Sequence, residues 1–112
     1  MSYTIAGTAD VDSVMDEEWG GMWFLRDALE AEQLGITILE MEPGCKGKAH
    51  DHSGDGQEEV CVVVAGKVDV ELPDETVTIE TDQAIRISAD QRRQLHNPYD
   101  EPAKLVLAGA GP

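Results

Sequence analysis

The fold of this chain is decided by residues 44–66, GCKGKAHDHSGDGQEEVCVVVAG. This stretch contains two of the three histidines, His50 and His52, together with the acidic residue Glu59. Residues two apart in an extended strand point to the same face, so both imidazoles can reach one point in space. Glu59 begins an apolar run that predicts the returning strand of a hairpin. Two imidazoles and a carboxylate on adjacent strands suit a divalent metal with open positions. The simpler alternative is a pair of solvated loop histidines beside an acidic turn.

This stretch resembles the first motif of the cupin superfamily, in which a Gly, a His-x-His pair, a Glu and a second Gly follow at set spacings. Gly44, His50, His52, Glu59 and Gly66 match that motif in order. The spacer before the Glu has six residues, where the family usually has three or four, and the inserted SGDG should only lengthen the loop. The resemblance implies an all-β fold, the cupin-type double-stranded β-helix or jelly-roll barrel. It also implies a divalent transition metal held by the two histidines and the glutamate.

The second motif of the family is nearly lost in this chain. It would cover residues 82–97, where Asn97 agrees with the family but Arg93 replaces the fourth metal-binding His. His96 lies three residues beyond Arg93 and has the opposite strand parity, so a regular strand would point it outward. A β-bulge would turn it inward as a further metal ligand.

Three side chains are candidates for substrate binding: Gln57, Arg93 and Asn97. Gln57 shares the strand parity of Glu59, so it either orients a bound molecule or fills a coordination position. Asn97 shares the parity of Arg93 and should face inward with it. The guanidinium of Arg93 leaves three alternatives open. It pairs with Glu59 and leaves a site without metal, it binds an anionic substrate through its planar fork, or it points outward into the acidic surface.

At 112 residues, the chain has room for one hydrophobic core and none for a second domain. We expect an N-terminal polar arm at residues 1–18 and a single barrel domain at residues 19–112. Residues 20–29 fit either a strand or a short helical turn. Short strands separated by turn signals are typical of a sandwich or barrel. They are predicted at residues 34–41, 48–52, 59–65, 67–72, 76–80, 84–88, 94–97 and 103–108.

The net charge of −15 arises from acidic residues spread along the whole chain. Such a surface is typical of proteins from a high-salt cytoplasm, because salt screens the self-repulsion, although an ordinary acidic protein is the alternative. Nucleic acid and anionic membranes are not expected partners, because basic patches are lacking. The two cysteines make no disulfide framework, and no apolar stretch is long enough for a membrane span. We therefore expect a cytoplasmic protein that binds a small molecule, and the polar arm suggests a homodimer.

These features leave three functional hypotheses. The first is a metal-binding cupin that holds Fe, Mn, Ni or Zn and acts as a dioxygenase, isomerase or lyase on a small oxygenated molecule. The second is a non-catalytic cupin that binds or senses a small anion through Arg93. The third is a structural module whose site is empty. The fold alone does not choose among them.

Overall fold

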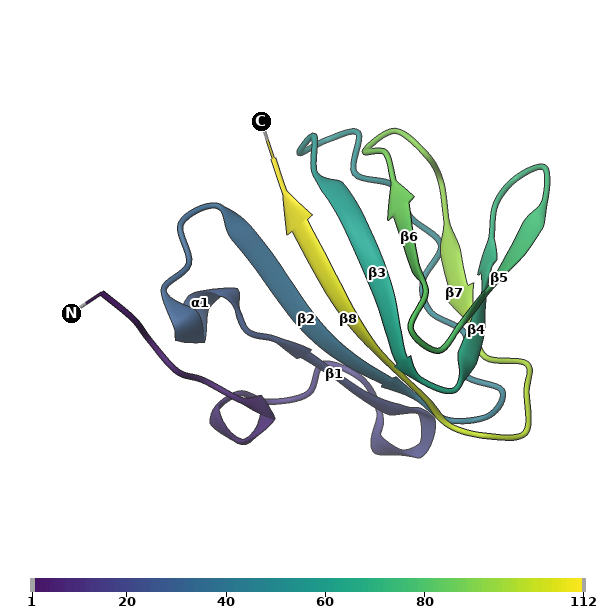
Figure 1. Cartoon of the computed structure of the whole chain (residues 1–112), viewed down its shortest axis with the longest axis horizontal. Coiled ribbons are helices and arrows are strands. Elements are labelled where there is room, and N and C mark those ends of the chain that lie inside the picture. Colours follow the sequence, from purple (N-terminus) through teal and green to yellow (C-terminus); the bar gives the residue numbers. More distant parts are fainter. Residues whose placement is uncertain (1, 112) are drawn as a thin grey trace.

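The computed structural model describes residues 2–111, and strands dominate its regular structure (Figure 1). Two 3-10 turns, η1 (Thr8–Asp10) and η2 (Glu17–Trp19), precede the first strand, and one helical turn, α1 (Arg26–Leu29), follows it. The strands in chain order are β1 (Gly20–Phe24), β2 (Leu34–Met41), β3 (Glu58–Ala65), β4 (Lys67–Glu71), β5 (Thr76–Glu80), β6 (Ala84–Ile87), β7 (Gln94–His96) and β8 (Ala103–Ala110).

The strands form two antiparallel sheets. One has the order β1-β2-β8-β3-β6, and the other has the order β5-β4-β7. From β3 onward the chain passes repeatedly from one sheet to the other, so that strands adjacent in the sequence are mostly not paired. In Figure 1, β2, β8 and β3 run side by side, and β4, β5 and β7 lie together at one side of them. The predicted all-β double-stranded β-helix is confirmed.

The crossing from β3 to β4 is a tight turn at Gly66, as predicted. Its φ of 76° lies in the left-handed region that favours glycine. A Cβ atom at this position would lie 2.6 Å from the backbone oxygen of Pro102. The turn is therefore closed to any larger residue, and it fixes where the second sheet begins relative to β3.

The hydrophobic core is contributed by both sheets. Val63 of β3 and Leu105 of β8 come from the larger sheet, and Val68 and Val70 of β4 come from the smaller one, and all four are fully buried. These residues follow the period-two alternation of half-buried strands, in which every second side chain faces inward. Burial of each such side chain contributes roughly 1.5–3 kcal/mol to folding.

Most strand predictions agree with the structure, but one is wrong. Residues 34–41 and 76–80 match β2 and β5 at both ends. Residues 48–52 form no strand. They make only an isolated bridge between His50 and Arg93. The expected hairpin with β3 is also wrong, because β3 pairs with β6 and β8 instead. The reason is that KAHDH has no apolar alternation to bury, and period-two polarity alone does not specify a partner strand.

Residues before the barrel lie along its first strand. The backbone N–H of Val14 donates to the carbonyl of Met22 at 2.9 Å, and the Met15 side chain packs against the core. Residues 20–29 contain both of the structures that fitted their sequence, since β1 is followed directly by α1. No helix among residues 2–111 is long and apolar enough to cross a membrane.

Candidate functional site

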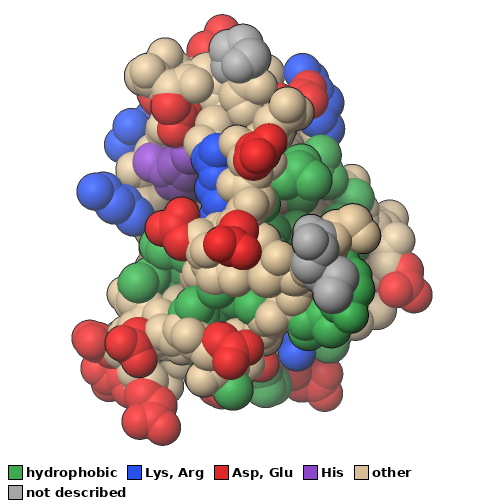
Figure 2. Space-filling view, turned by 90° about the vertical axis from the view of Figure 1, so that its left-hand side faces the viewer, with side chains coloured by type: hydrophobic (Ala, Val, Ile, Leu, Met, Phe, Trp, Pro, Cys, Tyr) green, Lys and Arg blue, Asp and Glu red, His purple; other side chains and the backbone are tan. Residues whose placement is uncertain are grey.

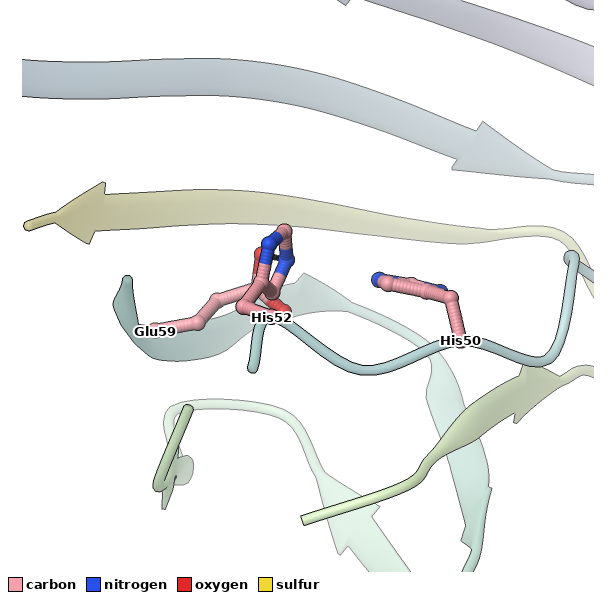
Figure 3. Close-up of side chains that lie close together, drawn as sticks. All are labelled: His50, His52 and Glu59. Atoms are coloured by element: carbon pink, nitrogen blue, oxygen red, sulfur yellow. Dashed lines mark ion pairs between the residues drawn. The ribbon is translucent and has the colours of Figure 1, made fainter. Parts of the chain in front are cut away.

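Three side chains with metal-binding chemistry meet in one cluster, as shown in Figure 3. Their ligand atoms, one each from His50, His52 and Glu59, all lie within 4.8 Å of one another. Nε2 of His52 is 3.7 Å from a carboxylate oxygen of Glu59. The imidazole rings of His50 and His52 meet edge to face, with their centroids 5.1 Å apart. All three residues are partly buried. The structure therefore brings together the residues that the first sequence motif singled out.

Backbone hydrogen bonds hold the two histidines in register without a regular strand. His50 and Arg93 exchange both backbone hydrogen bonds, at 3.0 and 2.9 Å. The backbone N–H of His52 donates to the carbonyl of Ala89 at 2.7 Å. The chain thus stays extended over these residues, and both rings project to the same side of the loop in Figure 3. Glu59 comes from β3 in the five-stranded sheet, so the ligands converge from separate parts of the barrel rather than from a hairpin.

The hydrogen bonds of the rings determine which nitrogen is free to bind a metal. Nδ1 of His50 lies 2.9 Å from the carbonyl of Lys48, and a carbonyl can only accept, so Nδ1 carries the proton. Nδ1 of His52 faces the carboxylate of Asp55 at 3.3 Å. The pKa of Asp55 is lowered, first by a hydrogen bond from the Gln57 backbone and then by His52, which keeps this carboxylate ionised. In both rings Nε2 is left with its lone pair, which is the arrangement seen around metal-bound histidines.

This donor set fits a borderline divalent metal. Two imidazole nitrogens and one carboxylate oxygen suit Fe, Mn, Ni or Zn, and three protein ligands leave positions open for other molecules. Ligand atoms on opposite sides of one ion lie up to about 4.4 Å apart when each bond is ~2.2 Å long. No two of the candidate ligand atoms lie more than 4.8 Å apart, so small side-chain rotations would bring all three onto one ion. The residues present therefore fit the metal that the first motif implied.

Cys61 supports Glu59 from the next inward position on β3. Its Sγ lies 3.8 Å from Oε1 of Glu59, and the thiol is the donor. Burial, with a further contribution from the Glu59 charge, raises the pKa of Cys61 to about 12. The thiol therefore stays protonated at neutral pH and serves as a small buried group with one weak hydrogen bond.

The cluster lies at the polar end of a pocket of about 340 Å³. Lys48, Gln57 and Arg93 line the pocket beside the three candidate ligands. The rest of the wall is largely apolar and comes mainly from the N-terminal segment, β1, β2, β7 and β8. Its apolar members are Met15, Met22, Phe24, Leu39, Met41, Leu95 and Leu107.

Arg93 lies inside the protein. Only 1% of its surface is exposed, which excludes the outward orientation. Its Nη2 donates to the carbonyl of Ser88 at 3.2 Å, whereas Nε and Nη1 have no protein acceptor within residues 2–111. The ion pairs found in that part of the chain do not include Arg93, so the suggested salt bridge with Glu59 is not formed. Strand parity correctly predicted that Arg93 points inward, but the suggested pairing of Arg93 with Glu59 does not occur.

Of the other predicted site residues, only Gln57 reaches the pocket. His96, considered as a further metal ligand, is not among the pocket-lining residues. Its Nδ1 lies 2.9 Å from a carboxylate oxygen of Glu71, in an ion-pair group that also contains Lys46. No bulge turns this side chain inward, because β7 keeps a regular register with β4.

Asn97 is buried but does not line the pocket. Its Nδ2 donates to the carbonyls of Met41 and Glu101, both at 2.9 Å, and its Oδ1 accepts the backbone N–H of Tyr99 at 3.1 Å. These bonds tie the turn after β7 to the end of β2. The amide is thereby occupied by backbone groups, so the structure does not bring it to a substrate.

We expect Asn97→Ala to destabilise the fold and to leave metal binding unchanged. The change leaves buried backbone N–H and C=O groups without a hydrogen-bond partner, and each lost hydrogen bond costs roughly 1–3 kcal/mol. Urea unfolding measures the loss, which we expect to be about 2–3 kcal/mol. Gln83→Ala is the matched control, because that exposed amide accepts a single backbone hydrogen bond and should cost little. Weaker ligand binding at unchanged stability would instead support a substrate-binding role for Asn97.

The apolar wall of the pocket was not predicted from the sequence. A signal for it existed in LGITILEM, where Gly35, Thr37, Leu39 and Met41 alternate with outward residues and all line the pocket. Directly paired residues of neighbouring strands share a face, and Met22 is paired with Leu39. The contribution of Met15 has no comparable signal, since it depends on how the N-terminal segment folds back.

Comparisons with known proteins agree with the fold and the motif. A family model described as a cupin domain matches residues 37–109. A protein from Streptomyces cyaneus called polyketide synthase CurC is 36% identical over 74 residues, covering 66% of this chain and 46% of that protein. The chain thus spans about half the length of this curated relative.

Solved structures give the same architecture at lower identity. A cupin protein from Bacteroides fragilis has a TM-score of 0.78 and 19% identity, and the match covers 99% of this chain and 86% of that one. A cupin 2 conserved barrel domain protein from Salinispora arenicola has a TM-score of 0.77 and 14% identity, covering 95% and 87% of the two chains. At these identities the likeness concerns the fold alone.

Proposed function

This chain belongs to the cupin domain family, and on that premise we propose that it is a metal-binding cupin whose His50, His52 and Glu59 hold one divalent transition metal. The observation that carries the proposal is the hydrogen bonding of the two rings. Each Nδ1 faces an acceptor, which leaves each Nε2 with its lone pair, and Nε2 of His52 lies beside the Glu59 carboxylate. Iron, manganese, nickel and zinc all suit these ligands.

The pocket supports a reaction on a small oxygenated organic molecule, of the dioxygenase, isomerase or lyase type. A metal held by these ligands would supply Lewis acidity toward an oxygen of that molecule. The residues of the chain would do the rest: Gln57 and Arg93 offer hydrogen-bond donors at the polar end, and the apolar wall excludes water. The relative from Streptomyces cyaneus is called a polyketide synthase, which favours an oxygenated organic molecule as the occupant.

A second candidate is a non-catalytic cupin that binds or senses a small anion. Arg93 at the position of the fourth His favours it, because the site then has one ligand fewer and one buried cation more. Metal content distinguishes the two candidates. The protein should be purified without chelator or affinity tag and analysed by anomalous scattering at the absorption edges of the four metals. About one ion per chain supports the metal-binding cupin, and none favours the anion-binding one.

We also propose that residues 1–18 form an arm on a barrel of residues 19–112, and that the protein is a cytoplasmic homodimer with no nucleic-acid or membrane partner. Three apolar side chains of the arm are strongly exposed: Tyr3 at 65%, Ile5 at 85% and Val14 at 60%. Their burial against a second copy would remove this apolar surface from water.

The dimer is tested by light scattering in molar salt. We expect the mass of two chains at high micromolar concentration. The double variant Ile5→Ser, Val14→Ser should shift the mass toward one chain, because it removes the apolar contact. Exchange of Val64, an exposed apolar residue on β3, for Ser serves as the control and should leave the mass unchanged. A monomeric wild type under these conditions would contradict the proposal.

A further inference from the structure

Among residues 2–111, the buried side-chain nitrogens and oxygens without a hydrogen-bond partner all belong to the guanidinium of Arg93. It is 99% buried, and its one hydrogen bond goes to the Ser88 carbonyl, while Nε and Nη1 have no protein acceptor. A buried charge without a hydrogen-bonded counter-ion is expensive, so such a group is normally paired. No ion pair among the described residues includes it. Within residues 2–111, no carboxylate therefore pairs with this guanidinium.

Arg93 also stands on the same face as the candidate metal ligands. His50 and Arg93 lie directly opposite each other in an antiparallel bridge, and directly opposed residues project to the same side with their Cβ atoms about 5 Å apart. Both side chains line the pocket. The positive charge is therefore a neighbour of the cluster rather than a separate feature of the wall.

The charges of this end of the pocket do not balance when a metal is bound. The metal-bound imidazoles are neutral, and the single charges of Glu59 and Arg93 cancel. A divalent ion would therefore leave two positive charges on the pocket lining, and the Asp55 carboxylate behind His52 offsets one of them. Lys48 adds a further cation at the exposed edge of the pocket. In Figure 2, Lys and Arg side chains flank the histidines on a face that otherwise carries many acidic groups.

The rest of the pocket lining suits an apolar body. It includes Met15, Met22, Phe24 and Leu107. A cavity of roughly 150 Å³ holds benzene, so the volume of about 340 Å³ accommodates a body of about two rings or an alkyl group of equal size.

We propose that the pocket binds an amphipathic carboxylate, whose carboxylate group pairs with Arg93 beside His50 and whose apolar body fills the space between β1, β2 and β8. The planar fork of a guanidinium matches a carboxylate in two parallel hydrogen bonds. The proposal narrows the substrate class of the proposed metal site. Only the role of the metal in it depends on the proposed metal-binding function. The unpaired guanidinium and the apolar wall carry the rest.

Three probes separate the parts of this proposal. 2-Naphthoate has the charge and the two-ring body, 2-naphthamide has the body without the charge, and acetate has the charge without the body. Titration calorimetry on the chelator-treated full chain should give 2-naphthoate an affinity about 10- to 100-fold above that of 2-naphthamide, because one charged hydrogen-bonded pair has that value. Acetate should bind far more weakly than 2-naphthoate.

The Arg93→Met variant identifies the group responsible. Replacing an unpaired buried charge with an apolar side chain of similar length is often stabilising, so this variant should fold. It should bind 2-naphthoate no better than 2-naphthamide, while its affinity for 2-naphthamide stays within a few-fold of the wild type. Phe24→Ala should weaken both naphthyl probes alike. Equal binding of acid and amide by the wild type, or a preference that persists in Arg93→Met, would overturn the proposal.

A titration with Mn²⁺ alone keeps this proposal distinct from the metal function. If Mn²⁺ binds but the acid is not preferred, the carboxylate proposal fails and the metal function stands. If the acid binds through Arg93 and Mn²⁺ does not bind, the metal function fails and the carboxylate site stands. If both bind, Mn²⁺ and 2-naphthoate should each raise the affinity of the other by the same factor, as thermodynamic linkage requires.

Discussion

Replacing His50, His52 or Glu59 with alanine should weaken transition-metal binding by more than about 100-fold. Loss of an outer-shell partner alone typically costs 10- to 100-fold, and these residues would be direct ligands. The wild type should bind about one ion per chain. Titration of chelator-treated protein with Mn²⁺, Fe²⁺, Ni²⁺ and Zn²⁺ measures both the stoichiometry and the loss. Glu59→Gln gives a milder test, because it removes the charge and keeps the shape of the side chain.

Two control variants resemble the ligand variants in chemistry but not in position. His96→Ala removes a histidine that pairs with Glu71. Glu58→Ala removes the carboxylate next to Glu59, which is exposed and bonded to Arg86 at 2.6 Å. Both should retain the metal. An equal loss in His96→Ala would mean that the binding site lies elsewhere, and absence of metal from the wild type would favour the anion-binding candidate.

Arg93→His adds a test of the lost fourth ligand. If Arg93 only occupies the position of a missing histidine, the variant should bind metal more tightly than the wild type. If Arg93 binds the carboxylate of the ligand, the variant should also lose its preference for an acid over the matching amide. Because Arg93 makes no ion pair with Glu59, we do not expect its removal to release a previously blocked carboxylate.

The parts of the fold that were predicted well are those with a local signal. Residues 34–41 form a mostly apolar run that is followed by the turn pair Pro43-Gly44, so β2 was visible in the sequence. Gly66 was identified as a tight turn, and its positive φ and the nearby Pro102 oxygen explain why only glycine fits there. Such features depend on neighbouring residues, and no knowledge of distant partners is needed to recognise them.

The parts that were missed depend on long-range pairing. The segment around His50 was expected to pair with β3, its neighbour in sequence, yet it bridges to Arg93 more than forty residues later. Pairing of this kind is decided by the whole topology, and a short polar segment has no pattern that specifies it. The grouping of His50, His52 and Glu59 was nevertheless anticipated, because the motif fixes their order and the spacing of the anchoring glycines.

Strand parity predicts to which face of the sheet a side chain points, but it does not predict which groups surround that side chain. It placed Arg93 and Asn97 inward, and both are buried. It did not show that the Asn97 amide would be hydrogen-bonded to three backbone groups, or that two nitrogens of Arg93 would have no hydrogen-bond partner. Those outcomes arise from the ends of β2 and β6 and from the turn after β7, which reach the two side chains only in the folded barrel.

Raising KCl from 0.1 to 1 M should increase the melting temperature by roughly 10 °C. The net charge of −15 is carried on a protein whose radius of gyration is only 13.9 Å, so like charges lie close together. The Debye length falls from ~10 Å to ~3 Å over this range, which screens most of that repulsion. A relief of roughly 2–3 kcal/mol corresponds to a shift of this size in a domain of about 100 residues.

The salt effect must be separated from a general effect of cosolutes and traced to charge. Sucrose at matched osmolality should raise the melting temperature by less than KCl, because it stabilises compact states without screening. Replacing Asp16, Glu17 and Glu18 with amides removes three of the fifteen excess negative charges from an exposed segment. Since self-repulsion scales with the square of the net charge, the rise with KCl should shrink by about a third. A melting temperature that is flat in KCl would reject adaptation to a high-salt cytoplasm and leave an ordinary acidic protein.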